Sequence, residues 1–169
     1  LMRFFRERMK NILKEKKIRS DIIEASVSSH VNDDFLELYK KTRVMNKFIS
    51  KDLGKNAVST YKRASNILDQ EKIVSKNGPD AVLFKYDEEK ELFEQINNIR
   101  KAFTLKDDRK NYENHLKLLS ETKLSTDKFF DNVKVNDENR DLKNNRLELL
   151  QILCSTFNSF VDFSKLEGT

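Results

Sequence analysis

The sequence predicts an all-α fold, a helical bundle of about eight helices, on three observations. Only 3 glycines and 1 proline occur in 169 residues, and these residue types punctuate turns and strands. Apolar residues recur at spacings of three and four, the period of an amphipathic helix. Strand-like alternation is absent. The length suits one core, so we expect a single all-helical, monomeric domain over residues 1–169.

Four helices are expected in the first 70 residues. Ser20 is a plausible cap for the second, and Asp33 precedes the third. The small residues Ala57 and Ala64 in the fourth favour a close helix–helix contact. The expected ranges are about 2–16, 20–27, 33–49 and 55–68. The apolar stripe of the first helix is formed by Met2, Phe5, Met9 and Ile12.

Residues 69–86 are expected to be irregular, with a turn at Asn77-Gly78-Pro79 and with Val82, Leu83 and Phe84 anchored to the core. Four more helices should follow. Their expected ranges are about 87–103, 107–121, 125–133 and 139–161, with Ser125 as the cap of the third of these. Helical spacing places Phe129 and Phe130 in the core.

Composition bounds the function. The net charge is +5, from 33 basic and 28 acidic residues, which is compatible with phosphate contacts but does not establish them. No run approaches the roughly 18 apolar residues of a membrane helix. The single cysteine excludes an internal disulfide and fits a cytoplasmic location. The chain opens on Leu1 without a signal-peptide pattern, and we expect it to be a piece of a longer protein.

Catalytic signatures are missing from the sequence. Gly54, Gly78 and Gly168 are isolated, so no glycine-rich phosphate loop is formed. His30 and His115 are far apart and lack ligand-spaced neighbours, which favours surface or partly buried side chains. Cys154 lies in an apolar context typical of a buried, inert thiol, and the pairs Asp33-Asp34 and Asp107-Asp108 suit helix caps. We therefore expect no catalytic residue, metal or cofactor in this chain.

Basic residues form one regular row in the first expected helix. Five cations at spacings of three and four share one face, and Arg8 and Lys16 widen it. Such a row could follow an RNA backbone. The alternative is a solvated face that Glu7 and Glu15 partly neutralise. The five residues are Arg3, Arg6, Lys10, Lys14 and Lys17.

A second candidate cluster combines basic and asparagine side chains, which suit base edges in unstacked loops. Its members are Lys62, Arg63, Asn66, Lys134, Arg140, Lys143, Asn144, Asn145 and Arg146. Arg63 and Arg146 could alternatively tie helices together. Bases could stack on tyrosines, although the sequence does not say which of them face solvent. The tyrosines are Tyr39, Tyr61, Tyr86 and Tyr112.

Ordered sequence blocks carry a family resemblance. The strongest are Phe129-Phe130-Asp131-Asn132-Val133 and Asn145-Arg146-Leu147 followed by Leu149-Leu150. Phe4 to Arg8, Lys62 to Leu68, and Leu83-Phe84 with the acidic run from Asp87 to Glu91 precede them in family order. The chain resembles the C-terminal anticodon-binding domain of the bacterial glycyl-tRNA synthetase β subunit. That DALR-type domain is named for an Asp-Ala-Leu-Arg tetrapeptide, where this chain has Arg140-Asp141-Leu142-Lys143.

The resemblance implies an all-helical fold and a role in recognising the anticodon arm of glycine tRNA. It further implies a whole enzyme with α2β2 subunits, in which ATP and Mg²⁺ serve glycylation at a site on the separate α subunit. The isolated chain should then show no aminoacylation. The alternative is a helical protein-interaction or subunit-contact domain that makes no direct contact with RNA.

Overall fold

The computed structural model describes residues 2–29, 34–71, 77–105 and 111–168. These ranges contain seven α-helices, two short 3₁₀ turns and no strand, so the all-α prediction is confirmed. The elements are α1 (Met2–Glu15), α2 (Ser20–Ser29), α3 (Phe35–Ile49), α4 (Asp52–Gln70), η1 (Ala81–Leu83), α5 (Asp87–Thr104), α6 (Tyr112–Asn132), α7 (Arg140–Asn158) and η2 (Phe163–Lys165).

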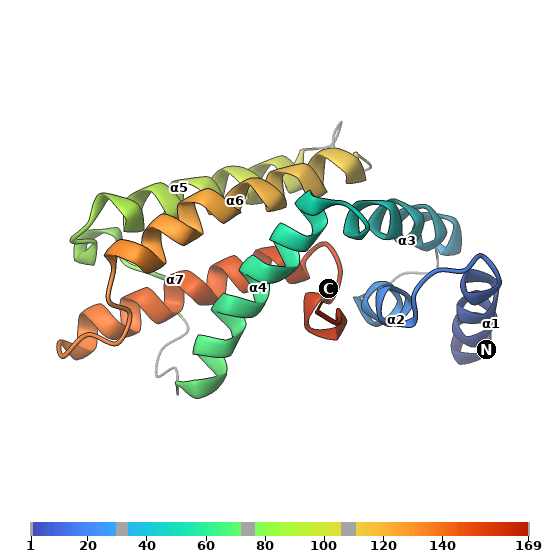
Figure 1. The fold of residues 1–169 in the computed structure, drawn as a ribbon, viewed down its shortest axis with the longest axis horizontal. Helices are drawn as coiled ribbons and strands as arrows, with labels where there is room; N and C mark the ends of the chain where they lie inside the picture. Colours follow the sequence, from blue (N-terminus) through green and yellow to red (C-terminus); the bar gives the residue numbers. More distant parts are fainter. Residues whose placement is uncertain (1, 30–33, 72–76, 106–110, 169) are drawn as a thin grey trace.

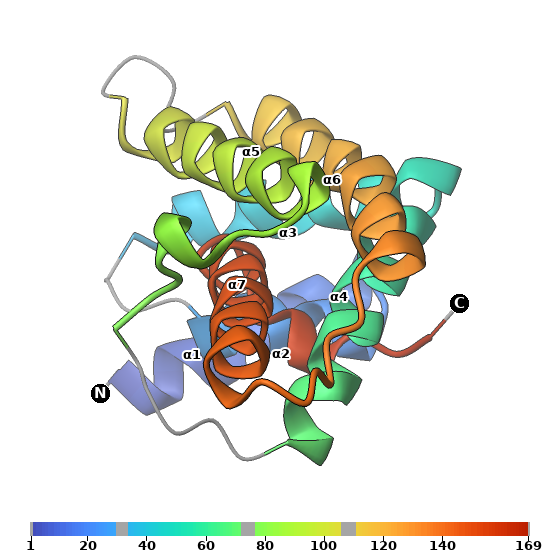
Figure 2. The same cartoon turned by 90° about the vertical axis from the view of Figure 1, so that its left-hand side faces the viewer.

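The helix α7 is the centre of the arrangement. Helices α5 and α6 run side by side above it in Figure 1, and α4 crosses it. Figure 2 looks along α7 and shows it surrounded by α4, α5 and α6. Helices α1, α2 and α3 lie together at the other end of the longest axis. The consecutive residues 145–150 of α7 are all buried, as a helix enclosed on several sides requires.

Polar side chains begin several helices. The Asp34 carboxylate accepts a hydrogen bond from the backbone N–H of Glu37 at 2.8 Å, and Asn139 accepts from the N–H groups of Asp141 and Leu142. Each satisfies donors that a helix start leaves open. The predicted capping role of Asp34 is thus confirmed, whereas Asp33, Asp107 and Asp108 lie outside the described residues.

The expected sixth and seventh helices are one helix, α6. Ser125, predicted as a cap, is buried in its interior, where its hydroxyl donates to the carbonyl of Thr122 at 3.0 Å. Ser120 and Thr122 donate in the same way to the carbonyls three residues earlier. With their hydroxyls satisfied inside the helix, these residues do not interrupt it.

The core follows the predicted faces with local exceptions. Phe129 and Val133 are buried, and Phe130 is half-buried against the core. In the irregular segment before α5, Phe84 is buried but Val82 is 85% exposed, so the predicted anchor is wrong for Val82. The side chain of Val82 lies in the single 3₁₀ turn η1, too short a helix to be covered by neighbours on all sides.

The corner between α3 and α4 depends on Gly54. A Cβ at this position would lie 2.3 Å from the Phe48 carbonyl oxygen and 2.6 Å from the Ile49 Cα. Both atoms belong to the backbone of α3 and cannot move aside individually. The absence of a side chain is what allows α4 to begin directly against the last turn of α3.

Replacing Gly54 with alanine is therefore expected to lower the free energy of unfolding by about 1–3 kcal/mol, the usual cost of overpacking. Because the clash is with backbone atoms, the overpacking cost should lie at the upper end of that range, so a net loss remains after the gain of about 1 kcal/mol in helix propensity. Urea titration followed by circular dichroism measures the change. Gly168→Ala is the matched control, since its Cβ would meet only the mobile end of Lys62 at 3.3 Å. An equal stability for both variants would contradict the steric explanation.

Candidate nucleic-acid interface

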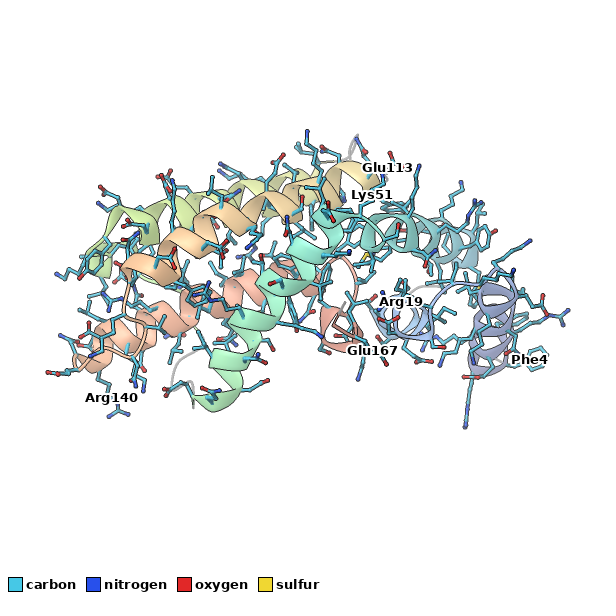
Figure 3. All side chains as sticks on the ribbon, in the orientation of Figure 1. Phe4, Arg19, Lys51, Glu113, Arg140 and Glu167 are labelled. Carbon is cyan, nitrogen blue, oxygen red and sulfur yellow. The ribbon has the colours of Figure 1, made fainter. Side chains whose placement is uncertain are left out.

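The predicted basic row on α1 and the start of α7 lie at opposite ends of the molecule. Figure 3 labels Phe4 of α1 at one end of the longest axis and Arg140 of α7 near the other. The row on α1 and the block that begins α7 therefore do not form one continuous surface. Each has to be considered as a separate candidate.

Arg146 is a structural residue. Its side chain is 1% exposed, and its guanidinium donates to Glu89 at 2.9 Å, to Asp137 at 2.8 Å and to the carbonyl oxygen of Lys134 at 2.9 Å. The buried Glu89 carboxylate also accepts the backbone N–H groups of Lys85 and Tyr86. This network joins α7 to the start of α5 and corrects the prediction that Arg146 contacts RNA.

Asn145 is also removed from the candidate contacts. It is buried, its amide oxygen accepts the N–H of Asp80 at 2.6 Å, and its amide nitrogen donates to the carbonyl of Asp80 at 3.0 Å. Both polar atoms of the side chain are engaged with the backbone that leads into η1. The asparagine thus fixes a loop instead of reading a base.

Two further residues of this cluster are engaged with protein. Lys143 forms an ion pair of 2.7 Å with Glu71 at the end of α4. Arg63 lies 3.4 Å from Asp127, and its guanidinium is 4.3 Å from the centroid of the Phe130 ring. Exposed side chains are present at Asn66, Lys134 and Arg140, and half-buried ones at Lys62 and Asn144.

The row on α1 is only partly available. Lys10 pairs with Glu24 at 2.9 Å, and this hydrogen bond raises the pKa of the lysine. Arg6 is half-buried, with its Nε covered. Arg3 and Lys14 are exposed on α1. Lys17 is also exposed, but it follows the end of α1 and has a φ of 59°, so the prediction of five cations on one helix face is wrong for Lys17.

The predicted apolar stripe of α1 is only partly covered by the described chain. Phe5 is 41% and Ile12 is 38% exposed, Met9 is half-buried, and Leu13 is the residue that is fully buried. The helix packs on α2 and α3 at the end of the molecule. Because α1 is packed on one side only, the side chain that is fully buried, Leu13, is not a member of the stripe that the spacing predicts.

A third basic row lies on α3 and was not predicted. Lys40, Arg43 and Lys47 recur at spacings of three and four, so they share one face, and all three are exposed. They line a groove of about 840 Å³ together with Tyr39, Asn46, Lys16, residues of the α1–α2 connection and the start of α6. The same spacing of three and four that predicts the row on α1 could have predicted this row. The helix expected over residues 33–49 is predicted from its apolar face alone.

The other side of α3 is a protein contact. Lys41 is turned away from the groove residues, and its ammonium lies 4.7 Å from the centroid of the Phe160 ring. Desolvation by burial lowers the pKa of Lys41. Lys41 therefore packs against the protein, whereas Lys40 and Arg43 line the groove.

The four tyrosines separate clearly. Tyr61 and Tyr112 are buried. The Tyr112 hydroxyl donates to Glu37 at 3.0 Å, and burial followed by this bond raises the Tyr112 pKa. Tyr86 is 45% exposed, with the Arg146 guanidinium 5.6 Å from its ring centroid. Tyr39 is half-buried in the groove, which makes it the tyrosine best placed beside unpaired cations.

Few features of the described residues suggest catalysis. Burial raises the pKa of the Cys154 thiol to about 12, as expected for an unreactive cysteine. His115 is buried, with its ring centroid 4.3 Å from that of Phe103, whereas a surface or partly buried position was predicted. His30 lies outside the described residues. Within the ranges that the structure describes, no group of three potential metal ligands occurs, and no helix has the length and apolarity to cross a membrane.

Comparison with known proteins gives a consistent result. Residues 57–164, from α4 to η2, match the family model of the DALR anticodon binding domain. The glycine–tRNA ligase beta subunit of Dinoroseobacter shibae is 30% identical over 172 residues, covering 99% of this chain and 24% of that protein. Those of Rickettsia africae and Rickettsia felis are 35% and 36% identical and cover 98% and 96% of the chain. The chain spans 24% of the length of these relatives.

Proposed function

Because the chain belongs to the DALR anticodon-binding domain family, we propose that it binds the anticodon arm of glycine tRNA as part of a glycine–tRNA ligase. The observation that carries the proposal is the match over residues 57–164, together with relatives aligned along nearly the whole chain. The relatives bear the name of a ligase beta subunit, and this supports glycine tRNA as the ligand.

In this proposal the chain contributes recognition and not chemistry. ATP, Mg²⁺ and glycine are handled by the α subunit of an α2β2 enzyme, while this segment orients the tRNA in the cytoplasm. Exposed cations such as Arg140 and Lys134 contact phosphates, which set the register of the RNA on the protein. Polar side chains such as Asn66 and Asn144 then read bases that are unstacked in the loop.

A second function is favoured at the α1 end. Phe4 is 61% and Phe5 is 41% exposed, and the Phe5 ring lies beside those of Phe4 and Phe35, with centroids 5.8 and 5.9 Å away. Exposed large apolar side chains that lie near one another are typical of protein contacts. A subunit or interdomain contact through α1 is compatible with RNA binding elsewhere on the chain.

The test is binding of fluorescently labelled glycine tRNA to the chain, compared with the same tRNA carrying another anticodon, over a series of salt concentrations. We expect tighter binding of the glycine anticodon and an affinity that falls with salt. Arg140→Ala and Lys134→Ala should each reduce the slope of log affinity against log salt by about 0.7–0.9 if the residue contacts one phosphate. Binding that ignores the anticodon and is unaffected by salt would overturn the proposal.

A further inference from the structure

The groove on α3 has a defined position in the fold. The exposed face of α3 contributes most of its lining. Lys16 and Ile18 of the connection between α1 and α2, and Tyr112 and Glu113 at the start of α6, line the rest. Its volume of about 840 Å³ is within the usual range of small-ligand sites, about 300–1,000 Å³. Most of this surface precedes residue 57, where the family match begins.

The groove is lined by four basic side chains that have no ion-pair partner among the described residues. Lys16, Lys40, Arg43 and Lys47 line it, and none of them forms an ion pair with any residue in the described part of the chain. The acids in the lining are Asp34, Glu37 and Glu113, so the four cations leave an excess of one positive charge.

Two of the three acids are already engaged. Asp34 caps α3, and Glu37 accepts the hydroxyl of the buried Tyr112. Among the residues that the structure describes, the four cations therefore have no carboxylate partner, unlike Lys10, Lys143 and Arg146 in the predicted clusters. Unpaired cations at helical spacing can each meet a phosphate along an extended strand.

An aromatic ring and an amide lie among these cations. The Arg43 guanidinium is positioned over the Tyr39 ring, 5.7 Å from its centroid, a cation–π arrangement that favours a fixed ring orientation. Tyr39 packs partly against the hydrophobic core and is half-buried, so only the remainder of its surface is open to the groove. Asn46 supplies both donors and an acceptor in the same lining. Stacking surface, hydrogen-bonding amide and cations together are the chemistry that binds unstacked nucleotides.

We infer that this groove binds nucleotides of single-stranded RNA, with a base stacked on Tyr39 and the adjoining phosphates held by Lys40, Arg43 and Lys47. The inference rests on the proposed function, because the tRNA would supply the single-stranded loop. It extends the RNA-binding surface beyond the family-matched helices to α3. It also identifies Tyr39 as the residue that distinguishes unstacked bases from duplex RNA.

The experiment compares two RNA probes and four protein variants. The probes are a seven-nucleotide single strand with the sequence of the glycine anticodon loop, and a seven-base-pair RNA duplex. The variants are Tyr39→Leu, which keeps apolar volume but removes the aromatic face, Tyr39→Phe, which retains it, Lys47→Ser, and Arg100→Ser. Arg100 is exposed on α5 and gives a control with the same change in charge. Circular dichroism verifies that each variant is folded.

We expect the wild-type chain to prefer the single strand. Tyr39→Leu should weaken single-strand binding by about tenfold, consistent with loss of one stacked base, and leave the duplex unaffected. Tyr39→Phe should restore it. Lys47→Ser should lower the salt slope by about 0.7, and Arg100→Ser should leave the slope unchanged.

Three results overturn the inference. If Tyr39→Leu and Lys47→Ser bind RNA like wild type, while wild type still binds glycine tRNA more tightly than the anticodon-swapped tRNA, the groove is not the RNA-binding site and the proposed function stands. If Tyr39→Leu has no effect and Lys47→Ser weakens both probes equally, the groove is an electrostatic surface that does not take bases. If wild type binds no RNA, both proposals fail. Groove-dependent binding without anticodon preference would support the groove and overturn the glycine-specific function.

Discussion

Replacing Arg146 with alanine is expected to lower the free energy of unfolding by about 3–5 kcal/mol, the cost of removing one partner of a buried ion pair. Glu89 is 0% exposed, and the substitution would remove the guanidinium that pairs with its carboxylate. Two backbone N–H groups would still donate hydrogen bonds to that carboxylate. The link to the Lys134 carbonyl and Asp137 would be lost as well. Urea titration at pH 7 gives the unfolding free energy directly.

Arg140→Ala is the control for this prediction. Arg140 is exposed in the first turn of α7, so the same chemical change should stay within about 0.5 kcal/mol of wild type. The double variant Arg146→Met with Glu89→Gln removes both charges and should be more stable than Arg146→Ala alone. Loss of less than 1 kcal/mol in Arg146→Ala would show that the network does not stabilise the fold.

Replacing Phe157 with alanine should cost a similar amount, about 3–5 kcal/mol, through lost burial and a cavity. Phe157 is 0% exposed near the end of α7. Its ring contacts Phe163 edge-on, with centroids 4.9 Å apart, and Tyr61 with centroids 6.0 Å apart. These contacts hold η2 and α4 against α7. We therefore expect the substitution to lower the free energy of unfolding of the whole domain and not only of its last turn.

The matched control is Phe4→Ala, the same truncation at a ring that is 61% exposed. It should change stability by no more than about 0.5 kcal/mol. Thermal or urea unfolding compares the two, and near-ultraviolet circular dichroism reports the packing around Tyr61. Equal losses in the two variants would contradict the assignment of Phe157 to the core.

Much of the fold follows from spacing, and the differences have local causes. The apolar period identifies α3 and α5 because each buries one continuous face. The segment from Ser120 to Ser125 was interpreted as a break since serine and threonine often lie at helix starts. In the structure these hydroxyls donate to carbonyls within α6. The sequence alone does not show whether a serine or threonine hydroxyl caps a helix or bonds inside one.

The candidate site was predicted less completely, because spacing shows which residues share a helix face but not what lies opposite. The partners of Arg146 and Asn145 on α5 and before η1 are 57 and 65 residues away in the chain. Nothing local separates them from their neighbours Arg140 and Asn144, which remain candidates. The row at Lys40, Arg43 and Lys47 is detectable from spacing, but its groove depends on how α3 meets the connection between α1 and α2 and the start of α6.

The double hydrogen bond between Asn145 and Asp80 has a consequence for how this protein can vary. It holds the backbone of residue 80 from α7, so the path from Asp80 into α5 is set from outside its own loop. A substitution at Asn145 would therefore act on the approach to α5 from a position 65 residues away in the chain, through the backbone N–H and carbonyl of Asp80.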